Sequence, residues 1–285
     1  VPSNARLGKI ARDFPESGVG RNHLESLLNQ LRSGPSRITL EQFTEMREQI
    51  KEAAERGILS AMLLLGDNLR KTEPETAFRW YSAASAKGNA YALMQRGLLL
   101  ANGVGDEKPD FAKAVESLQA AADKGDPSAK YLLAESYLTG RGLPAKDVQR
   151  AVELAQEASD AGDSRAMNLL GDCYAHGTGV TQDFARAFQL FARASAMGNT
   201  QALGNLGVLY MTGRGVAANP KKGAELFEKG ARAGDAMCMF YFAQCLEDGL
   251  GVAKDVTEAR TWFIKAARAG NTRAADWCKS RSVPF

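Results

Sequence analysis

The sequence lacks several features that point to particular classes of protein. No run of 18 apolar residues occurs, which argues against a transmembrane helix. Lys and Arg number 36 against 33 Asp and Glu, so the formal net charge is only +3. This balance, with no evident basic stripe, argues against nucleic-acid binding. Apolar residues at 45% and charged residues at 24% are ordinary for a globular chain and argue against disorder throughout.

Residues for metal and disulfide chemistry are also scarce. The 285 residues include two histidines, His23 and His176, and four cysteines without a CxxC pair. Cys238 and Cys245 lie seven residues apart, which is about 10 Å along one helix and too far for a disulfide. We therefore expect no metal and no cofactor. Four reduced, buried cysteines are expected, which slightly favours a cytoplasmic location: Cys173, Cys238, Cys245 and Cys278.

Glycine, in contrast, is abundant and periodic. A glycine follows each alanine-rich run, and these glycines serve here as repeat markers: Gly57, Gly88, Gly125, Gly162, Gly198, Gly234 and Gly270. Their spacings are 31, 37, 37, 36, 36 and 36 residues. A period in this range is typical of helical repeat proteins.

Each marker glycine is followed by the pattern of one helix. Alanine recurs four residues on, leucine eight on, a small residue nine on, and tyrosine or leucine twelve on, as in Ala166, Leu170, Gly171 and Tyr174. These positions share one helical face. The small residue at the ninth position predicts a close approach by a second helix.

A Gly-x-Gly turn and a second helix complete each repeat. The turns are Gly103/Gly105, Gly140/Gly142, Gly177/Gly179, Gly213/Gly215 and Gly249/Gly251. The next residues suited to cap a helix are Asp110, Asp147, Asp183, Asn219 and Asp255. The following helix carries small and aromatic residues such as Ala187 and Phe191 on its packing side. Acidic and basic residues such as Glu225, Glu228 and Lys229 alternate on it, which predicts a solvated face.

These units predict an all-α, right-handed α-solenoid of antiparallel helix pairs with repeats of 36–37 residues. Residues 39–57 are expected to form a capping helix that begins at the Thr39-x-x-Gln42 capping box. One shortened and five full repeats follow over 58–271, and 272–285 form a C-terminal capping helix and tail. Residues 1–38 are expected to hold an arm (1–20) and a short helix (22–32).

The repeat resembles the Sel-1-like repeat, a tetratricopeptide-type α-solenoid. The shared pattern is Ala-x-x-x-Leu-Gly-x-x-Tyr-x-x-Gly-x-Gly-Val, then Asp, Ala, Phe and Ala-x-x-Gly, and it is clearest over 166–198 within a match of 58–278. The resemblance implies a non-enzymatic adaptor. Some relatives are linked to penicillin binding and others are rich in disulfides, but this chain has neither a Ser-x-x-Lys motif nor paired cysteines.

Motifs of catalysis are missing. There is no Walker A loop, HExxH or Gly-x-Ser-x-Gly motif, and the Gly-x-Gly turns follow no strand. His176 occupies a repeat position that other repeats fill with polar residues, and we expect it to lie at a helix C-terminus without a catalytic role. No catalytic residue is predicted. The chain starts at Val1 and its first 20 residues lack a signal-type hydrophobic segment, so a trimmed chain and a periplasmic or secreted location stay open.

One stripe of the first helix in each repeat is not needed for the predicted packing. It contains more apolar and aromatic residues than a solvated face requires, which favours a groove for a protein or peptide, although curvature could bury part of it. The predicted groove residues are Tyr91, Met94, Leu98, Tyr131, Glu135, Leu138, Arg165, Asn168, Asp172, His176, Val208, Met211, Met237, Phe240 and Gln244.

Three functional hypotheses follow from these observations. The first is a scaffold that binds a protein or peptide in the groove. The second is a small-ligand or cell-wall-fragment binding protein or enzyme, which would need convergent polar groups in one pocket. The third is self-association, with residues 1–20 of one chain in the groove of another. Nucleic-acid binding and membrane insertion are not expected.

Overall fold

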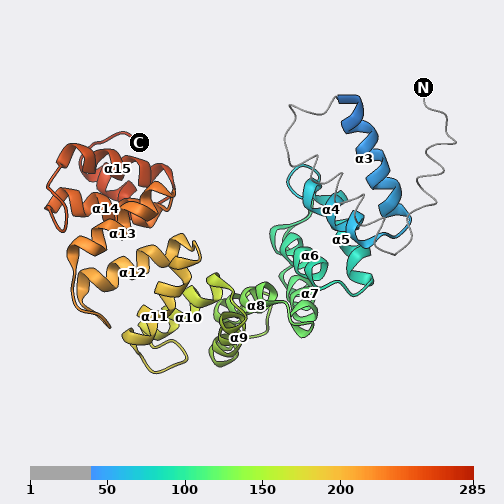
Figure 1. Cartoon of the computed structure of the whole chain (residues 1–285), viewed down its shortest axis with the longest axis horizontal. Coiled ribbons are helices and arrows are strands. Elements are labelled where there is room, and N and C mark those ends of the chain that lie inside the picture. The colour runs from blue at the N-terminus through green and yellow to red at the C-terminus, as the bar shows by residue number, and fades with distance from the viewer. Residues whose placement is uncertain (1–39) are drawn as a thin grey trace. The chain divides into compact units, whose positions relative to one another are not determined.

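The computed structural model describes residues 40–285, with side chains from Arg47 onward, and over this range it contains only helices and their connections (Figure 1). The expected arm and short helix within 1–38 lie outside the described residues. The helix expected over 39–57 is α3, Leu40–Glu55. No helix between residues 40 and 285 has both the length and the apolar character needed to cross a bilayer.

The remaining helices alternate between two kinds. The first helices of the repeats are α4 (Leu59–Leu69), α6 (Ala90–Asn102), α8 (Pro127–Thr139), α10 (Ser164–His176), α12 (Thr200–Thr212), α14 (Ala236–Asp248) and α16 (Thr272–Ser280). The second helices are α5 (Pro74–Ala86), α7 (Phe111–Asp123), α9 (Val148–Asp160), α11 (Phe184–Ala196), α13 (Pro220–Arg232) and α15 (Val256–Arg268). Consecutive helices pack on one another from α3 to α7 and from α9 to α16, which confirms the predicted α-solenoid of helix pairs.

The chain forms two compact units. The N-terminal unit extends to Ala129 and includes Arg141–Pro144. The C-terminal unit consists of Lys130–Gly140 and Ala145–Phe285. Each unit has its own buried cluster of side chains, around Tyr81 in the first and around Phe227 and Phe263 in the second.

Within a pair, the small residue at the ninth repeat position lies against an aromatic ring, as its size predicts. A Cβ atom at Gly207 would lie 2.6 Å from the Phe227 ring, and one at Gly171 would lie 2.6 Å from the Phe191 ring. Both rings are almost completely buried. Glycine is therefore required at these two positions because the second helix approaches more closely than any side chain allows.

Turns between helices are set by glycine and by capping side chains. The marker glycines have φ between +80° and +94°, a conformation that side-chain-bearing residues rarely adopt. The predicted caps are confirmed: Asp110, Asp147, Asp183, Asn219 and Asp255 each accept a hydrogen bond from a backbone N–H in the first turn of their helix.

The four cysteines are buried and unpaired, as predicted. Burial raises the pKa of the Cys173 and Cys245 thiols to about 11, and it also raises those of Cys238 and Cys278. These thiols are therefore protonated near neutral pH and act as small apolar side chains.

Candidate functional site

The predicted groove residues lie on the first helices, and the structure assigns them three degrees of exposure. In the C-terminal unit, the exposed ones are Glu135, Arg165, His176, Met237 and Gln244. The partly buried ones are Tyr131, Leu138, Asp172, Val208 and Met211. In the N-terminal unit, Tyr91 and Leu98 are partly buried. The remaining three are buried: Met94, Asn168 and Phe240.

The expectation that Met94, Asn168 and Phe240 are exposed is wrong. Their relative exposures are 7%, 8% and 7%, and all three occupy the sixth position after the marker glycine. At this position in α14, the Phe240 ring lies 5.7 Å from the Phe263 ring of α15. In these three repeats the sixth position therefore contributes to packing, and the exposed residues of the face lie mainly at the third, tenth and fourteenth positions.

A cluster of amide and carboxylate groups joins two neighbouring first helices on this face. The Asn205 amide of α12 donates to Asp172 Oδ1 at 2.9 Å and to Asn168 Oδ1 at 3.0 Å, and both acceptors belong to α10. The Asn168 amide donates in turn to Asp172 Oδ2 at 3.3 Å. These three residues are called the Asp172 cluster below.

Asn205 was not among the predicted groove residues. It occupies the seventh position after its marker glycine, which lies on the same helical face as the third and tenth positions because these are spaced by three and four residues. Tyr241 and Trp277 occupy the same position in later repeats, and both are partly buried. The spacing alone could have identified this position.

Asp172 is a partly buried titratable group of this face. Burial raises the pKa of its carboxyl group to about 6, and the nearby His176 ring opposes the shift. The His176 Nδ1 atom lies 2.9 Å from the Asp172 backbone oxygen, and the ring is exposed at the C-terminus of α10, as predicted. A half-buried carboxylate lowers the stability of the folded chain because it loses water, and an apolar side chain at the same position would not carry this cost.

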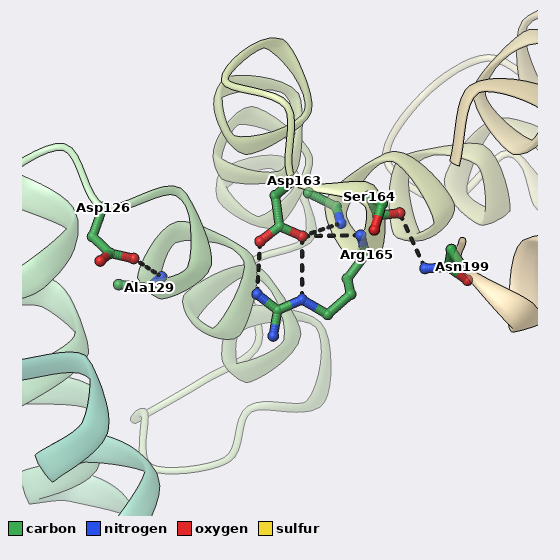
Figure 2. A network of polar contacts seen from close by, with 7 residues as sticks. Asp126, Ala129, Asp163, Ser164, Arg165 and Asn199 are labelled. Carbon is green, nitrogen blue, oxygen red and sulfur yellow. Dashed lines mark hydrogen bonds and ion pairs between the residues drawn. The ribbon is translucent and has the colours of Figure 1, made fainter. Parts of the chain in front are cut away.

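Further along the face, aromatic and charged side chains of α8 and α10 lie together. The Arg165 guanidinium lies 4.7 Å from the centre of the Tyr131 ring and forms a 2.6 Å ion pair with Asp163. Figure 2 shows this ion pair at the start of α10. The pKa of Tyr131 is raised by burial and by its hydrogen bond to Glu135. Tyr131 is thus fixed in position with part of its ring accessible.

The cap residues at the edge of this face also connect repeats. Asn199 caps α12 and its amide donates to the Ser164 backbone oxygen of α10 at 3.2 Å, as Figure 2 shows. Asn271 forms the same bridge to Ala236 at 3.3 Å. An aspartate at this position, such as Asp163, caps its helix but has no amide to donate.

A hollow of about 380 Å³ in the N-terminal unit is lined by Arg47, Ile50, Leu65, Asn68, Leu69, Thr72 and Glu73, which include no cysteine, serine or histidine. Among the residues that the structure describes, no group of three or more His, Cys, Asp or Glu side chains could hold a metal ion.

Comparison with known protein families identifies the repeat. The Sel1 repeat model matches six consecutive segments: residues 53–89, 90–126, 127–163, 164–199, 200–235 and 236–271. The chain belongs to the Sel1 repeat family. Sel1 repeats typically form scaffolds for protein–protein interaction. No curated protein matches this chain in sequence.

Solved structures of Sel1 repeat proteins resemble the chain along most of its length. A Sel1 repeat protein from Oxalobacter formigenes is 27% identical with a TM-score of 0.67, over 75% of this chain and 84% of that one. The protein c5321, a protective antigen of uropathogenic Escherichia coli strains, is 28% identical with a TM-score of 0.66 over 88% of this chain. This chain spans 57% of the length of c5321. The immunity protein PA5088 from Pseudomonas aeruginosa, at 19% identity and a TM-score of 0.52, shares the fold.

Proposed function

We propose that this Sel1 repeat chain is a non-enzymatic scaffold that binds a partner protein or peptide on the exposed face of its first helices, centred on the Asp172 cluster. The observation that carries the proposal is the cluster itself. Asn168, Asp172 and Asn205 place a half-buried carboxylate and two amides where smaller apolar side chains would give a more stable array. A role in recognition accounts for that cost.

The surroundings of the cluster suit a polypeptide ligand. Amide and carboxylate groups can exchange their mutual hydrogen bonds for bonds to a peptide backbone. Partly buried aromatic rings lie on either side along the array, Tyr131 on α8 and Tyr241 on α14. Polar groups flanked by anchored rings are typical of the energetically important part of a protein interface.

The test is capture of a partner from the native lysate by two matched variants. Gln201→Arg with Gln244→Arg adds two charges to exposed positions of the first-helix face. Gln189→Arg with Thr261→Arg adds the same charges to exposed positions of the second helices. We expect the first variant to lose at least ten-fold in binding, or roughly 1.4 kcal/mol, while the second retains it.

The double variant Tyr131→Ala with Phe240→Ala, at two predicted groove residues, would test folding rather than binding because Phe240 is part of the core. A partner captured equally by wild type and both variants would contradict the proposed face. If the first-helix variant instead abolished binding of a small glycan and no protein were captured, the second functional hypothesis would replace this one.

A further inference from the structure

The outward positions of the second helices differ sharply in charge along the C-terminal unit. These positions lie 2, 5, 9 and 12 residues before each marker glycine, on the side opposite the buried residues of the helix. In α9 they are Arg150, Glu153, Glu157 and Asp160. In α11, α13 and α15 they include seven basic residues: Arg186, Arg193, Lys222, Lys229, Arg232, Lys265 and Arg268.

The seven basic residues are called the basic face below. They outnumber the acidic residues among the twelve outward positions of α11, α13 and α15, four in each helix. Only Glu225 and Glu258 are acidic there, which leaves a net charge of +5 on a chain whose net charge is +3. All seven basic side chains are exposed. The expectation that the chain has no basic stripe is therefore wrong. Acidic and basic residues alternate locally, as in Glu225, Glu228 and Lys229. The excess of basic residues is therefore seen only when the outward positions of several repeats are counted together.

The basic groups are in register from one repeat to the next. Arg193, Lys229 and Lys265 each lie five residues before a marker glycine, at the position where α9 has Glu157. Over the described part of the chain, none of these three forms an ion pair, whereas Glu157 pairs with Lys130 at 2.6 Å. Three equivalent cations thus face solvent without internal neutralisation.

Aromatic rings beneath the face support several of its cations. Lys265 Nζ lies 4.2 Å from the Trp262 ring centre and Lys222 Nζ lies 4.7 Å from that of Tyr210. Arg186 contacts the Tyr174 ring and donates to its hydroxyl at 3.2 Å. Trp262 and Tyr210 are themselves buried. The rings hold the charged groups in place but are not available to stack on nucleobases.

We propose that the basic face docks the chain on an anionic lipid surface. The basic residues extend over about 15 Å along α13, about 10 Å along α11 and about 5 Å along α15. Because they come from three successive second helices, they form a patch rather than a single line. A sheet of anionic headgroups complements such a patch better than one nucleic-acid strand does. Met197, which is 56% exposed and four residues from Arg193, adds an apolar contact at its edge.

Sedimentation with vesicles tests this assignment. We expect the wild-type chain to bind equimolar phosphatidylglycerol–phosphatidylcholine vesicles at low salt, to release at high salt, and to ignore pure phosphatidylcholine. The variant Arg193→Glu, Lys229→Glu and Lys265→Glu should bind more than about a hundred-fold more weakly, because the loss of three basic residues alone costs about five-fold each. Glutamate is already present at this position in α9, so the fold accepts it.

Two further variants keep the result interpretable. Lys71→Glu, Arg79→Glu and Lys108→Glu make the same change in net charge at exposed sites of the N-terminal unit, and this variant should bind vesicles like wild type. Arg193→Gln, Lys229→Gln and Lys265→Gln remove the charges without reversing them and should give an intermediate loss. Circular dichroism confirms that each variant folds.

The proposal is overturned if the wild-type chain ignores anionic vesicles at low salt, or if both glutamate variants lose binding equally. Retention on heparin or DNA that depends on Arg193, Lys229 and Lys265, without vesicle binding, would assign the basic face to another polyanion and would equally overturn it. None of these outcomes depends on the partner proposed for the first-helix face.

Discussion

The two helices of each C-terminal repeat share one core but present different chemistry to solvent. The first helices α10, α12 and α14 carry amides, partly buried rings and a half-buried carboxylate, with few exposed cations. The second helices α11, α13 and α15 carry the seven cations of the basic face. Most packing positions change little between repeats, so the difference lies mainly in positions that packing constrains less. A helical repeat can therefore evolve two surfaces independently.

The largest expected effect comes from breaking the core that both surfaces share. Gly207→Val would place side-chain atoms inside the Phe227 ring, since even a Cβ would lie 2.6 Å from it. We expect the free energy of unfolding, measured by urea denaturation, to fall by about 3 kcal/mol. Both binding activities should be lost near the urea concentration at which half of the chain is unfolded. Thr261→Val on the exposed side of α15 should change stability by less than about 0.5 kcal/mol. Equal effects of the two substitutions would contradict the close helix contact.

A smaller effect is expected when only the first-helix face is altered. Since the pKa of Asp172 is about 6 in the folded chain, above the ordinary value of 3.8 for an aspartate, the folded state binds this proton more tightly than the unfolded state does. The free energy of unfolding should therefore fall as pH rises from about 4 to about 6.

Asp172→Asn should remove that pH dependence and stabilise the chain by about 1 to 2 kcal/mol at pH 7. This gain is smaller than the shift in the Asp172 pKa implies, because the new amide N–H group would lie where a carboxylate oxygen accepts a hydrogen bond in the wild-type chain. The matched control is Glu135→Gln, at the same repeat position but exposed, which should leave the pH dependence unchanged. A variant less stable than wild type at pH 7 would show that the Asp172 cluster stabilises the array.

The smallest effect is a gain on the second-helix face. Asp160 occupies in α9 the position of Arg232 and Arg268, and it is exposed. Asp160→Arg should extend the basic face by one repeat and strengthen binding to anionic vesicles about five-fold, measured by sedimentation at low salt. Partner capture should not change. If vesicle binding stayed the same, the membrane-binding surface would end at α11, and enlarging the basic face would not strengthen binding.

Much of the fold follows from the sequence because it depends on local signals. Glycine markers with positive φ, cap residues such as Asp183, and small residues opposite rings such as Gly171 and Phe191 each act within one repeat. Their recurrence every 36 or 37 residues identifies the array before any contact between repeats is considered.

The binding face was predicted less well because it depends on contacts between helices, both within a repeat and between repeats. Phe240 is buried by its packing on α15, which the helical period of α14 alone does not show. Asn168 and Asn205 form a hydrogen bond although 37 residues separate them, and Asp172 lies partly buried beside them. The basic face was missed for another reason. The helices α13 and α15 have mixed charge and α11 has two basic residues, so the surplus becomes visible only when equivalent positions such as Arg193, Lys229 and Lys265 are compared.

The most direct test of the two separate surfaces is to measure partner capture and vesicle sedimentation on the same two variants. The variant with Gln201→Arg and Gln244→Arg should lose the partner and keep the vesicles. The variant with Arg193→Glu, Lys229→Glu and Lys265→Glu should lose the vesicles and keep the partner. Loss of both activities in either folded variant would show that the two faces act as one surface, contrary to this account.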